Sequence, residues 1–359
     1  MKGVIHLEKS MFLIIPQTIC KLDGLEATAF QFSSGVQAVR IENPSGYIVV
    51  LPFQGQQIWD AVFHDRRLTM QSFFPEPKPA TQLLDSYGAF LFHCGALRMG
   101  TPSAEDTHPL HGELPNASYK EAWLLFGQDD KGPYLGVSGN FTWMKAFGDK
   151  YRATPRCVLH RDSTVIDVEM TIENLLDAPM DLMYMCHINF LPAMNGEIVQ
   201  ATGWGPQDMV IRSSIPSHVH PSVEYLSFME ALKTNPGVTR QIRPEDQYNP
   251  EIVFYVHNLR HDAIGLTHML QKHTDGCADY IAWNIQKLNH AVRWILINED
   301  QKVMAFALPS TCDPEGYIAE KKKGNVRTIP PLGKEVFSVR VGYMDQDESA
   351  RIEALINSV

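Results

Sequence analysis

The sequence predicts an all-β fold in which large antiparallel sheets form a sandwich, with few short helices. Runs of five to ten residues rich in β-branched and aromatic side chains recur along the chain, often with apolar and polar positions alternating. Turn-forming residues separate them; residues 43–46, for example, read Asn-Pro-Ser-Gly between two such runs. The clearest runs are residues 27–31, 36–41, 47–53, 134–143, 165–172 and 336–343.

The length of 359 residues is compatible with one domain, because large all-β sandwiches commonly exceed about 200 residues without dividing. The sequence shows neither a fixed-period repeat nor a convincing linker. We therefore predict a single domain over residues 1–359, with its core in about 35–345. The stretch 204–250 is rich in Gly, Pro, Ser and His with weak periodicity, and we interpret it as long surface connections.

The one helix that the pattern favours lies at the C-terminal end, over about residues 347–357. Asp347 or Ser349 could cap its first turn. A single terminal helix leaves the predicted fold class unchanged. The apolar face of this helix would consist of Ile352, Leu355 and Ile356.

The charge and hydropathy of the chain argue against two classes of partner. A net charge of −10 would repel a phosphate backbone, so we expect no nucleic-acid partner. The lysine cluster at residues 321–323 is followed by Gly324 and Asn325 and fits a solvated turn. No stretch approaches the ~20 apolar residues of a membrane span, so we expect no membrane partner.

The cysteines and the N-terminal segment predict a cytoplasmic protein. The apolar piece 11–16 is short and follows charged residues, which does not match a secretory signal. The cysteines are scattered without paired spacing, which favours free thiols in a reducing compartment. They are Cys20, Cys94, Cys157, Cys186, Cys277 and Cys312.

One histidine segment invites a metal interpretation. His218, His220 and Glu224 have a spacing that partly resembles the first metal-binding motif of the cupin family. The glycine that precedes that motif and the second histidine motif of cupins are not clear here. A proline-flanked polar loop is the simpler interpretation, and we predict no bound metal or cofactor.

A polar segment rich in glycine and proline is the first candidate binding site. Residues 93–100 and 107–116 combine these residues with hydrogen-bonding side chains, as a hydroxyl-binding pocket requires. Trp123 follows, and its indole could stack on the apolar face of a sugar ring, although a tryptophan followed by Leu-Leu-Phe is more often part of the core. The polar members of the segment are Arg98, His111, Glu113 and Asn116.

The second candidate is His187, in the segment 185–190, which reads Met-Cys-His-Ile-Asn-Phe after a strand-like run. An imidazole has a reference pKa near ~6.5 and can exchange a proton near neutral pH. A lone histidine in an apolar strand is more often a hydrogen-bonded core residue. The pattern alone therefore leaves both roles open.

Four motifs together resemble the aldose 1-epimerase superfamily, and in particular a branch known only as aldose 1-epimerase-like. That branch carries Cys-Gly-Leu-x-x-x-Gly, Leu-His-Gly-x-x-x-Asn, His-x-Asn-Phe and a late Glu-Pro-x-x-Cys. Residues 94–100, 110–116 and 187–190 are similar to the first three, and residues 308–312 show the fourth in altered form, Leu-Pro-Ser-Thr-Cys. Their order and spacing agree over about 35–345.

The resemblance implies a galactose mutarotase-like supersandwich and an acid–base mechanism without metal or cofactor. In that family a carboxylate takes the proton of the anomeric hydroxyl, a histidine protonates the ring oxygen, and the opened sugar closes to the other anomer. By position, His187 would be the acid. His111 and Arg98 would bind hydroxyls or polarise the ring oxygen, and Asn116 would hold the loop.

The carboxylate of that mechanism is missing from its expected position. Leu308 stands where the family has its late glutamate, and a leucine cannot accept a proton. Glu113 is the nearest motif carboxylate, and Glu315 is a second candidate for the base. His257 also resembles a position of the branch and could line the cleft, or serve as a structural residue at a strand end.

Three functional hypotheses follow. The first is an enzyme that interconverts anomers or epimers of a free or modified aldose, its small-molecule partner. The second, favoured by the loss of the glutamate, is a carbohydrate-binding protein without catalysis. The third is a cupin-type metal-dependent isomerase. The sequence determines neither the sugar nor the oligomeric state, for which a homodimer is one option.

Overall fold

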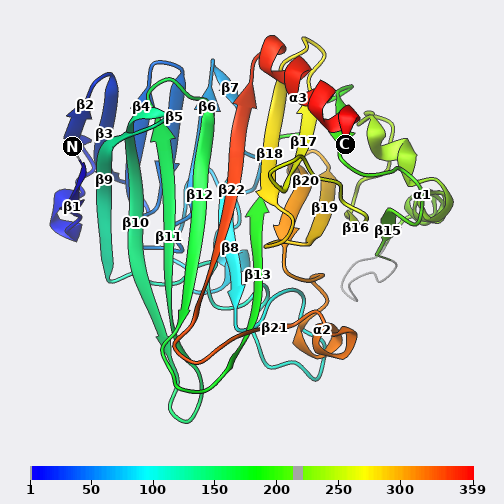
Figure 1. The fold of residues 1–359 in the computed structure, drawn as a ribbon. Helices are drawn as coiled ribbons and strands as arrows, with labels where there is room; N and C mark the ends of the chain where they lie inside the picture. Colours follow the sequence, from blue (N-terminus) through cyan, green and yellow to red (C-terminus); the bar gives the residue numbers. More distant parts are fainter. Residues whose placement is uncertain (1, 213–220) are drawn as a thin grey trace.

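The fold consists of two large antiparallel sheets packed against each other, as a computed structural model shows (Figure 1). The structure describes residues 2–212 and 221–359. Tyr184 of one sheet stacks on Phe337 of the other, with ring centroids 4.5 Å apart. The predicted all-β sandwich with few helices is therefore confirmed.

The first sheet has nine strands and forms the face nearest the viewer in Figure 1. Long hairpins build its centre, because consecutive strands of alternating pattern are joined by short turns. In spatial order its strands are β1 (Lys2–His6), β9 (Glu121–Asp129), β10 (Gly132–Met144), β11 (Lys150–His160), β12 (Val165–Asn174), β22 (Lys334–Met344), β18 (Ala278–Asn284), β17 (Leu266–Lys272) and β14 (Glu197–Gln200).

The second sheet has thirteen strands and supplies the region that carries the two histidine motifs. Two of its strands, β7 (Arg66–Arg67) and β21 (Arg327–Ile329), pair beside the main path. Along that path the strands are β15 (Met209–Ile211), β16 (Ile252–Val256), β19 (His290–Ile297), β20 (Lys302–Ser310), β13 (Met180–Ile188), β8 (Leu91–Ala96), β6 (Ile58–Phe63), β5 (Gly46–Val50), β4 (Gln37–Asn43), β3 (Leu25–Gln31) and β2 (Gln17–Leu22).

Each of the six predicted runs falls on a strand, and the burial pattern shows why. In β12 every second side chain is buried, because alternate residues point to opposite faces of a sheet. The predicted run 47–53 is too long: β5 ends at Val50, shortly before Pro52, which has no N–H for a strand ladder. The inward residues of β12 are Ile166, Val168, Met170 and Ile172.

The helices lie at the periphery of the sandwich (Figure 1). The C-terminal helix α3 begins at Gln346, and its cap is Asp345, whose carboxylate accepts from the Glu348 N–H at 2.8 Å. The prediction of Asp347 or Ser349 as the cap is therefore wrong by two to four residues. The helices are α1 (Val223–Thr234), α2 (Tyr317–Lys323) and α3 (Gln346–Ser358), with 3₁₀ turns at Lys9–Met11, Leu83–Ser86 and Pro236–Arg240.

The stretch 204–250, predicted as surface connections, contains regular structure. Strand β15, helix α1 and the turn Pro236–Arg240 all lie within it. Helix α1 has a serine cap, Ser222, and buries Tyr225, Met229 and Leu232. Apolar residues such as Val223 and Leu226 also lie on its exposed face, so the sequence shows no clear helical period. That weak period is the reason for the wrong prediction.

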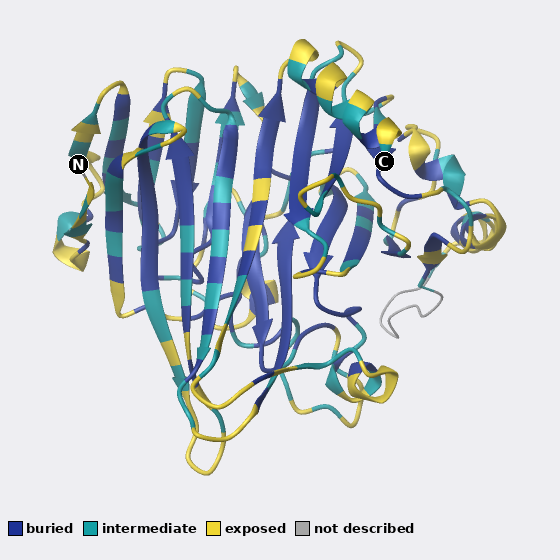
Figure 2. Cartoon of the chain, in the orientation of Figure 1, coloured by how far each residue is buried: buried dark blue, intermediate teal, exposed yellow. Residues whose placement is uncertain are grey.

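The two faces of β13 have different roles. Tyr184 points between the sheets, where its hydroxyl is 2.8 Å from His93 Nδ1 of the neighbouring strand β8. Because side chains alternate, His187 points to the opposite face, away from the other sheet. Figure 2 shows buried residues along the strands of both sheets, with intermediate and exposed positions between them on the front sheet, whereas the loops and helices carry many of the exposed residues. The alternation of side chains along the strands therefore places His93 in the core between the sheets and His187 on the outer face, at the candidate site.

The buried His93 predicts a loss of stability in acid. Burial lowers the pKa of His93 to about 4, whereas in the unfolded chain it is near ~6.5. Between these values the unfolded chain binds more protons, so the free energy of unfolding falls as the pH falls. For this residue we expect a loss of about 2–3 kcal/mol between pH 7 and pH 4.5.

Chemical denaturation of the wild type and of His93→Gln at both pH values measures this contribution. The variant should be less stable at pH 7 but should lose about 2–3 kcal/mol less on acidification. The exposed His261 supplies a matched His261→Gln control. Equal acid sensitivity of wild type and His93→Gln would show that His93 does not carry the effect.

Candidate functional site

The candidate site lies on the outer face of the thirteen-stranded sheet, around the end of β13. His187 pairs in register with Phe92 of β8, and the two rings stack with centroids 4.5 Å apart and planes 14° apart. The His187 side chain is buried, at 3% exposure, beneath residues from the surrounding loops. The stack fixes the plane of the imidazole.

The histidines of the two motifs lie next to each other. The rings of His111 and His187 meet edge to face, with centroids 5.4 Å apart. The loop brings His111 there because its backbone is held at both ends: its N–H donates to Gly100 and its carbonyl accepts from Gly95, each at 2.9 Å. His111 is partly buried, and its Nδ1 has no hydrogen-bond partner among the described residues.

Both imidazoles are neutral near pH 7. Burial, together with the electrostatic effect of the neighbouring His108 and Arg212, lowers the pKa of His111 to about 4. Burial and the adjacent His111 hold the pKa of His187 well below its usual value. Each neutral ring has a lone pair that can accept a proton, and the lowered pKa makes it a weaker base than a free imidazole.

Asn189 determines which nitrogen of His187 carries the proton. The Asn189 side-chain N–H donates to the Ala89 carbonyl at 2.9 Å, so its oxygen is the group that faces His187 Nδ1, at 2.8 Å. An amide oxygen only accepts, and Nδ1 must therefore be protonated. In the neutral ring Nε2 then carries a lone pair. The Tyr87 hydroxyl lies 3.4 Å from this nitrogen.

Two aromatic rings complete the surroundings of His187. Tyr87 follows the 3₁₀ turn Leu83–Ser86, and Trp294 comes from β19. Their ring centroids lie 6.2 Å and 5.7 Å from that of His187, and 5.7 Å from each other, all nearly perpendicular. Indole and phenol faces of this kind suit the apolar face of a ring-shaped ligand.

A charged pair that the sequence did not indicate lies beside these rings. Glu251 accepts from Trp294 Nε1 at 2.7 Å and forms an ion pair with Arg212. The residues come from segments about forty positions apart, and no local pattern relates them. Trp294 alone had a sequence signal, because it lies in an alternating strand-like run with Val292 and Leu296.

Glu113 is in the motif loop, but its carboxylate is occupied elsewhere. One oxygen accepts from the N–H groups of Ala96 and Leu97, at 3.0 and 2.9 Å, and from the Tyr151 hydroxyl, at 2.7 Å. Tyr151 belongs to β11 of the other sheet and is fully buried. Burial raises the pKa of Glu113 against the opposing effect of these bonds. This geometry suits a loop anchor and does not suit a base facing His187.

Arg98 is turned away from the histidine pair. Its guanidinium lies over the ring of Tyr317, 3.5 Å from the centroid, and donates to the Leu97 carbonyl at 2.6 Å. The preceding residues of the loop are near the site, but the side chain extends toward helix α2. The structure does not bring Arg98 together with His187.

Asn116 is buried and acts between loops. Its side-chain N–H donates to the Gln82 carbonyl at 2.8 Å, and its oxygen accepts from Gln57 at 2.8 Å. Asn116 thereby ties the histidine loop to the segment that leads to Tyr87. A hollow of about 310 Å³ lies between the two segments, lined by Thr81, Gln82, Leu83, Leu84, Pro109, Leu110, Gly112, Pro115 and Asn116.

The remaining candidates lie in different places. Trp123 is on β9 of the other sheet, paired with His6. His257 follows β16, and its carbonyl accepts from Thr202 at 2.6 Å. Glu315 accepts from the Tyr255 hydroxyl at 2.8 Å and pairs with a lysine of α2. Leu308 is buried in β20. Among the described residues, no hydrogen bond or aromatic contact joins Trp123, His257 or Glu315 to the histidine pair. Leu308 lies on β20, the strand that pairs with β13 beside His187, with Met185 opposite Ser310.

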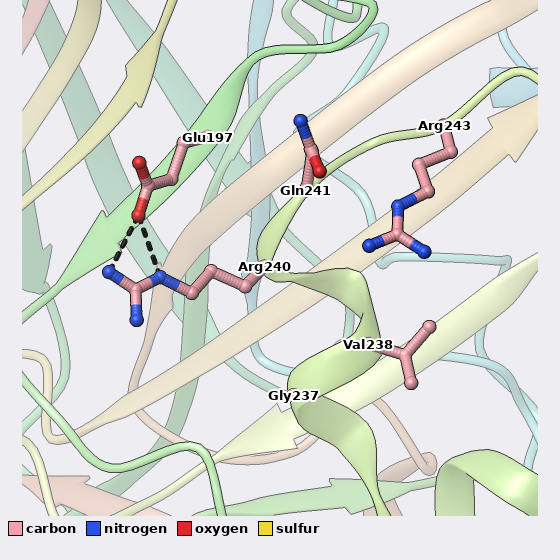
Figure 3. Close-up of a pocket in the computed structure, with 6 residues that line it drawn as sticks. All are labelled: Glu197, Gly237, Val238, Arg240, Gln241 and Arg243. Atoms are coloured by element: carbon pink, nitrogen blue, oxygen red, sulfur yellow. Dashed lines mark hydrogen bonds and ion pairs between the residues drawn. The ribbon is translucent and has the colours of Figure 1, made fainter.

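A larger hollow, of about 380 Å³, is separate from this site (Figure 3). It lies at the turn Pro236–Arg240, where the Arg240 guanidinium forms an ion pair with Glu197. None of the residues predicted from sequence lines it. Its lining residues are Glu197, Gly237, Val238, Arg240, Gln241 and Arg243.

Metal binding has little support in the described part of the chain. No group of three His, Cys, Asp or Glu side chains there could hold a metal ion. Glu224 lies in the first turn of α1, and His218 and His220 lie outside the described residues. Across residues 2–212 and 221–359, no helix has the length and apolarity needed to cross a membrane.

Comparison with known proteins identifies the fold. A domain family of unknown function, DUF4432, matches residues 33–197, and no curated protein matches the sequence. The structure is similar to that of a candidate aldose 1-epimerase from Klebsiella pneumoniae, with a TM-score of 0.82 and 14% identity, over 100% of this chain and 96% of that one. The protein has the galactose mutarotase-like fold.

Two further structures share this mutarotase-like fold. A galactose mutarotase-like protein from Clostridium acetobutylicum has a TM-score of 0.59 and 13% identity, over 90% of this chain and 99% of that one. A candidate mutarotase from Salmonella typhimurium has a TM-score of 0.57 and 11% identity, over 92% of this chain and 97% of that one. The resemblance and the predicted supersandwich are thus confirmed at the level of the fold, which hosts function in its sites.

Proposed function

We propose that this protein binds a free or modified aldose beside His187 and His111 and interconverts its anomers by acid–base ring opening, without metal or cofactor. The observation that carries the proposal is the contact between these two imidazoles, bordered by Tyr87 and Trp294. In this proposal the chain acts as one domain in a reducing cytoplasm, in keeping with its six free cysteines.

The spacing of the histidines suits the chemistry of an anomeric centre. The anomeric hydroxyl and the ring oxygen are bonded to the same carbon, so groups that serve both must lie close together. The ring centroids of His111 and His187 are 5.4 Å apart. A proton-exchanging group within hydrogen-bond reach of both oxygens is the requirement of general acid–base catalysis.

The hydrogen bonding of His187 favours a different first role from the one that the resemblance implies. With Nδ1 donating to Asn189, Nε2 offers a lone pair. A neutral imidazole with a low pKa begins the reaction as a proton acceptor, and it becomes a donor only after it has taken a proton. We therefore propose His187 as the group that takes the first proton.

Sugar binding without catalysis is the second candidate function. It is favoured by one observation: Leu308 occupies the position of the late glutamate and is buried, at 2% exposure. A protein of this kind would use the aromatic rings and polar groups around His187 to hold a sugar. It would leave the rate of anomer exchange unchanged.

Exchange NMR and polarimetry test the proposal. The wild-type protein is mixed with freshly dissolved, anomerically pure α-D-glucose, α-D-galactose, α-D-xylose and β-L-arabinose, and the rate of approach to equilibrium is compared with that in buffer. We expect acceleration of at least one of these sugars. If every rate equals that with heat-denatured protein, anomer interconversion is ruled out for the panel, and the proposal fails.

A further inference from the structure

We infer that Arg212 binds the ring oxygen of the sugar and that His187 carries a single proton from the anomeric hydroxyl to that oxygen, so that no carboxylate base is required. The inference deepens the proposed function and rests on it. It accounts for a site in which the expected glutamate is a leucine.

Arg212 directly follows β15, and its ion-pair partner Glu251 connects it to Trp294, which borders His187. Its backbone N–H donates to the Val253 carbonyl at 2.8 Å, which continues the pairing of β15 with β16. Its side chain is 17% exposed, so the guanidinium is largely sheltered from solvent. Burial lowers the pKa of His111 to about 4, and the charge of Arg212 adds to this effect; burial raises the pKa of Tyr255, and the same charge opposes that rise.

Glu251 pairs with the Arg212 guanidinium and is fixed in turn by a hydrogen bond from Trp294. One of its oxygens accepts from Trp294 Nε1 and the other pairs with Arg212. Both carboxylate oxygens of Glu251 are thus engaged by protein donors. Glu251 is therefore a positioning residue that links Arg212 to Trp294, and Trp294 borders His187.

Arg98 and Lys323 are less suitable than Arg212 for binding the ring oxygen of a sugar. Arg98 is stacked on Tyr317. Lys323 forms ion pairs with Asp313, Glu315 and Glu320, and its charge is more than neutralised. Among residues 2–212 and 221–359, Arg212 pairs with one carboxylate; a guanidinium has five N–H donors, so it can also donate to a ligand. A guanidinium also stays protonated at any working pH.

The proposed reaction balances without a second acid or base. His187 Nε2 takes the proton of the anomeric hydroxyl, the carbonyl of the open aldehyde forms, and the electron pair of the bond from the anomeric carbon to the ring oxygen goes to that oxygen. Arg212 stabilises the resulting negative charge until the His187 imidazolium returns the same proton to it. Rotation of the aldehyde and reversal of these steps give the other anomer.

The test uses variants of Arg212 and Glu251 with whichever sugar of the panel the wild type accelerates most. Loss of a donor that stabilises developing charge costs about 10²–10³-fold in kcat, so we expect a loss of that size in Arg212→Ala with little change in KM. Arg212→Lys keeps the charge and should recover part of the rate. Arg243→Ala, at the separate hollow, is the matched control and should keep the wild-type rate.

Glu251→Gln and the pH profile separate this mechanism from one with a carboxylate base. If Glu251 only orients Arg212, Glu251→Gln should lose less kcat than His187→Ala. A neutral His187 that accepts the first proton predicts a kcat that is constant from pH 6.5 to 8 and falls in acid. A protonated His187 that acts as the acid would instead give a rate that rises as the pH falls.

Each outcome decides the inference. A wild-type kcat in Arg212→Ala, an equal loss in Glu251→Gln and His187→Ala, or a rate that rises in acid would overturn it while leaving anomer interconversion in place. Should Arg212→Ala fail to fold, as judged by its melting temperature, the Arg212→Lys kcat and the pH profile decide. If the wild type accelerates no sugar of the panel, the proposed function fails, and the inference fails with it.

Discussion

Replacement of His187 with alanine should lower the kcat of anomer interconversion by about 10²–10⁴-fold, the usual contribution of a general acid–base group. The hydrogen bond from His187 Nδ1 to Asn189 leaves the lone pair of His187 Nε2 available to accept a proton. Alanine cannot accept a proton. The rate of the variant should therefore approach that of the free sugar in buffer.

The control for this prediction is His261→Ala, which removes an exposed imidazole far along the chain from both motifs. His257→Ala is a second comparison, since the sequence also named His257 as a residue of the cleft. Circular dichroism of all three variants checks that the fold persists. A His187→Ala protein that is folded and as fast as the wild type would exclude His187 from catalysis and would favour the binding function.

The fold could be predicted because its information is local and repeated. A strand such as β12 shows its core face in its own alternation of Ile166, Val168 and Met170 with charged residues. Turn residues such as Asn43 separate neighbouring strands in the sequence itself. The helix α1 was missed because its burial depends on three residues and on a sheet edge formed elsewhere in the chain.

The site could be predicted only in part, because it combines local motifs with distant partners. His111 and His187 each lie in a recognisable motif, and the family resemblance brought them together before the structure did. Arg212 and Glu251 have no motif, and their pairing depends on the register of β15, β16 and β19. The register between strands cannot be read from the spacing of residues along the sequence.

The direction of a side chain was the least predictable feature. Arg98 and Glu113 occupy the motif loop as expected, but Tyr317 and Tyr151 draw them away from His187. Both tyrosines come from elements more than thirty residues away in sequence. A polar residue in a binding loop can thus serve the loop itself, which is the physical reason that the expected roles of these two differ from their contacts.

Gly112→Ala should reduce the free energy of unfolding by about 3–5 kcal/mol and displace His111. Gly112 has φ of +84°, and an added Cβ would lie 2.1 Å from the Arg98 carbonyl oxygen and 2.7 Å from that of Gly95. These are backbone atoms of the strand end that anchors the loop, so they cannot move independently. The variant therefore adds a clash to the strain of a left-handed alanine.

Gly132→Ala is the matched control, because its φ of +109° is similarly unfavourable but no described atom lies within 4 Å of the added Cβ. It should cost only about 1–2 kcal/mol, the conformational cost alone. Urea denaturation compares the two. If Gly112→Ala were no less stable than Gly132→Ala, the close packing of the histidine loop on the end of β8 would be wrong, and with it the placement of His111 beside His187.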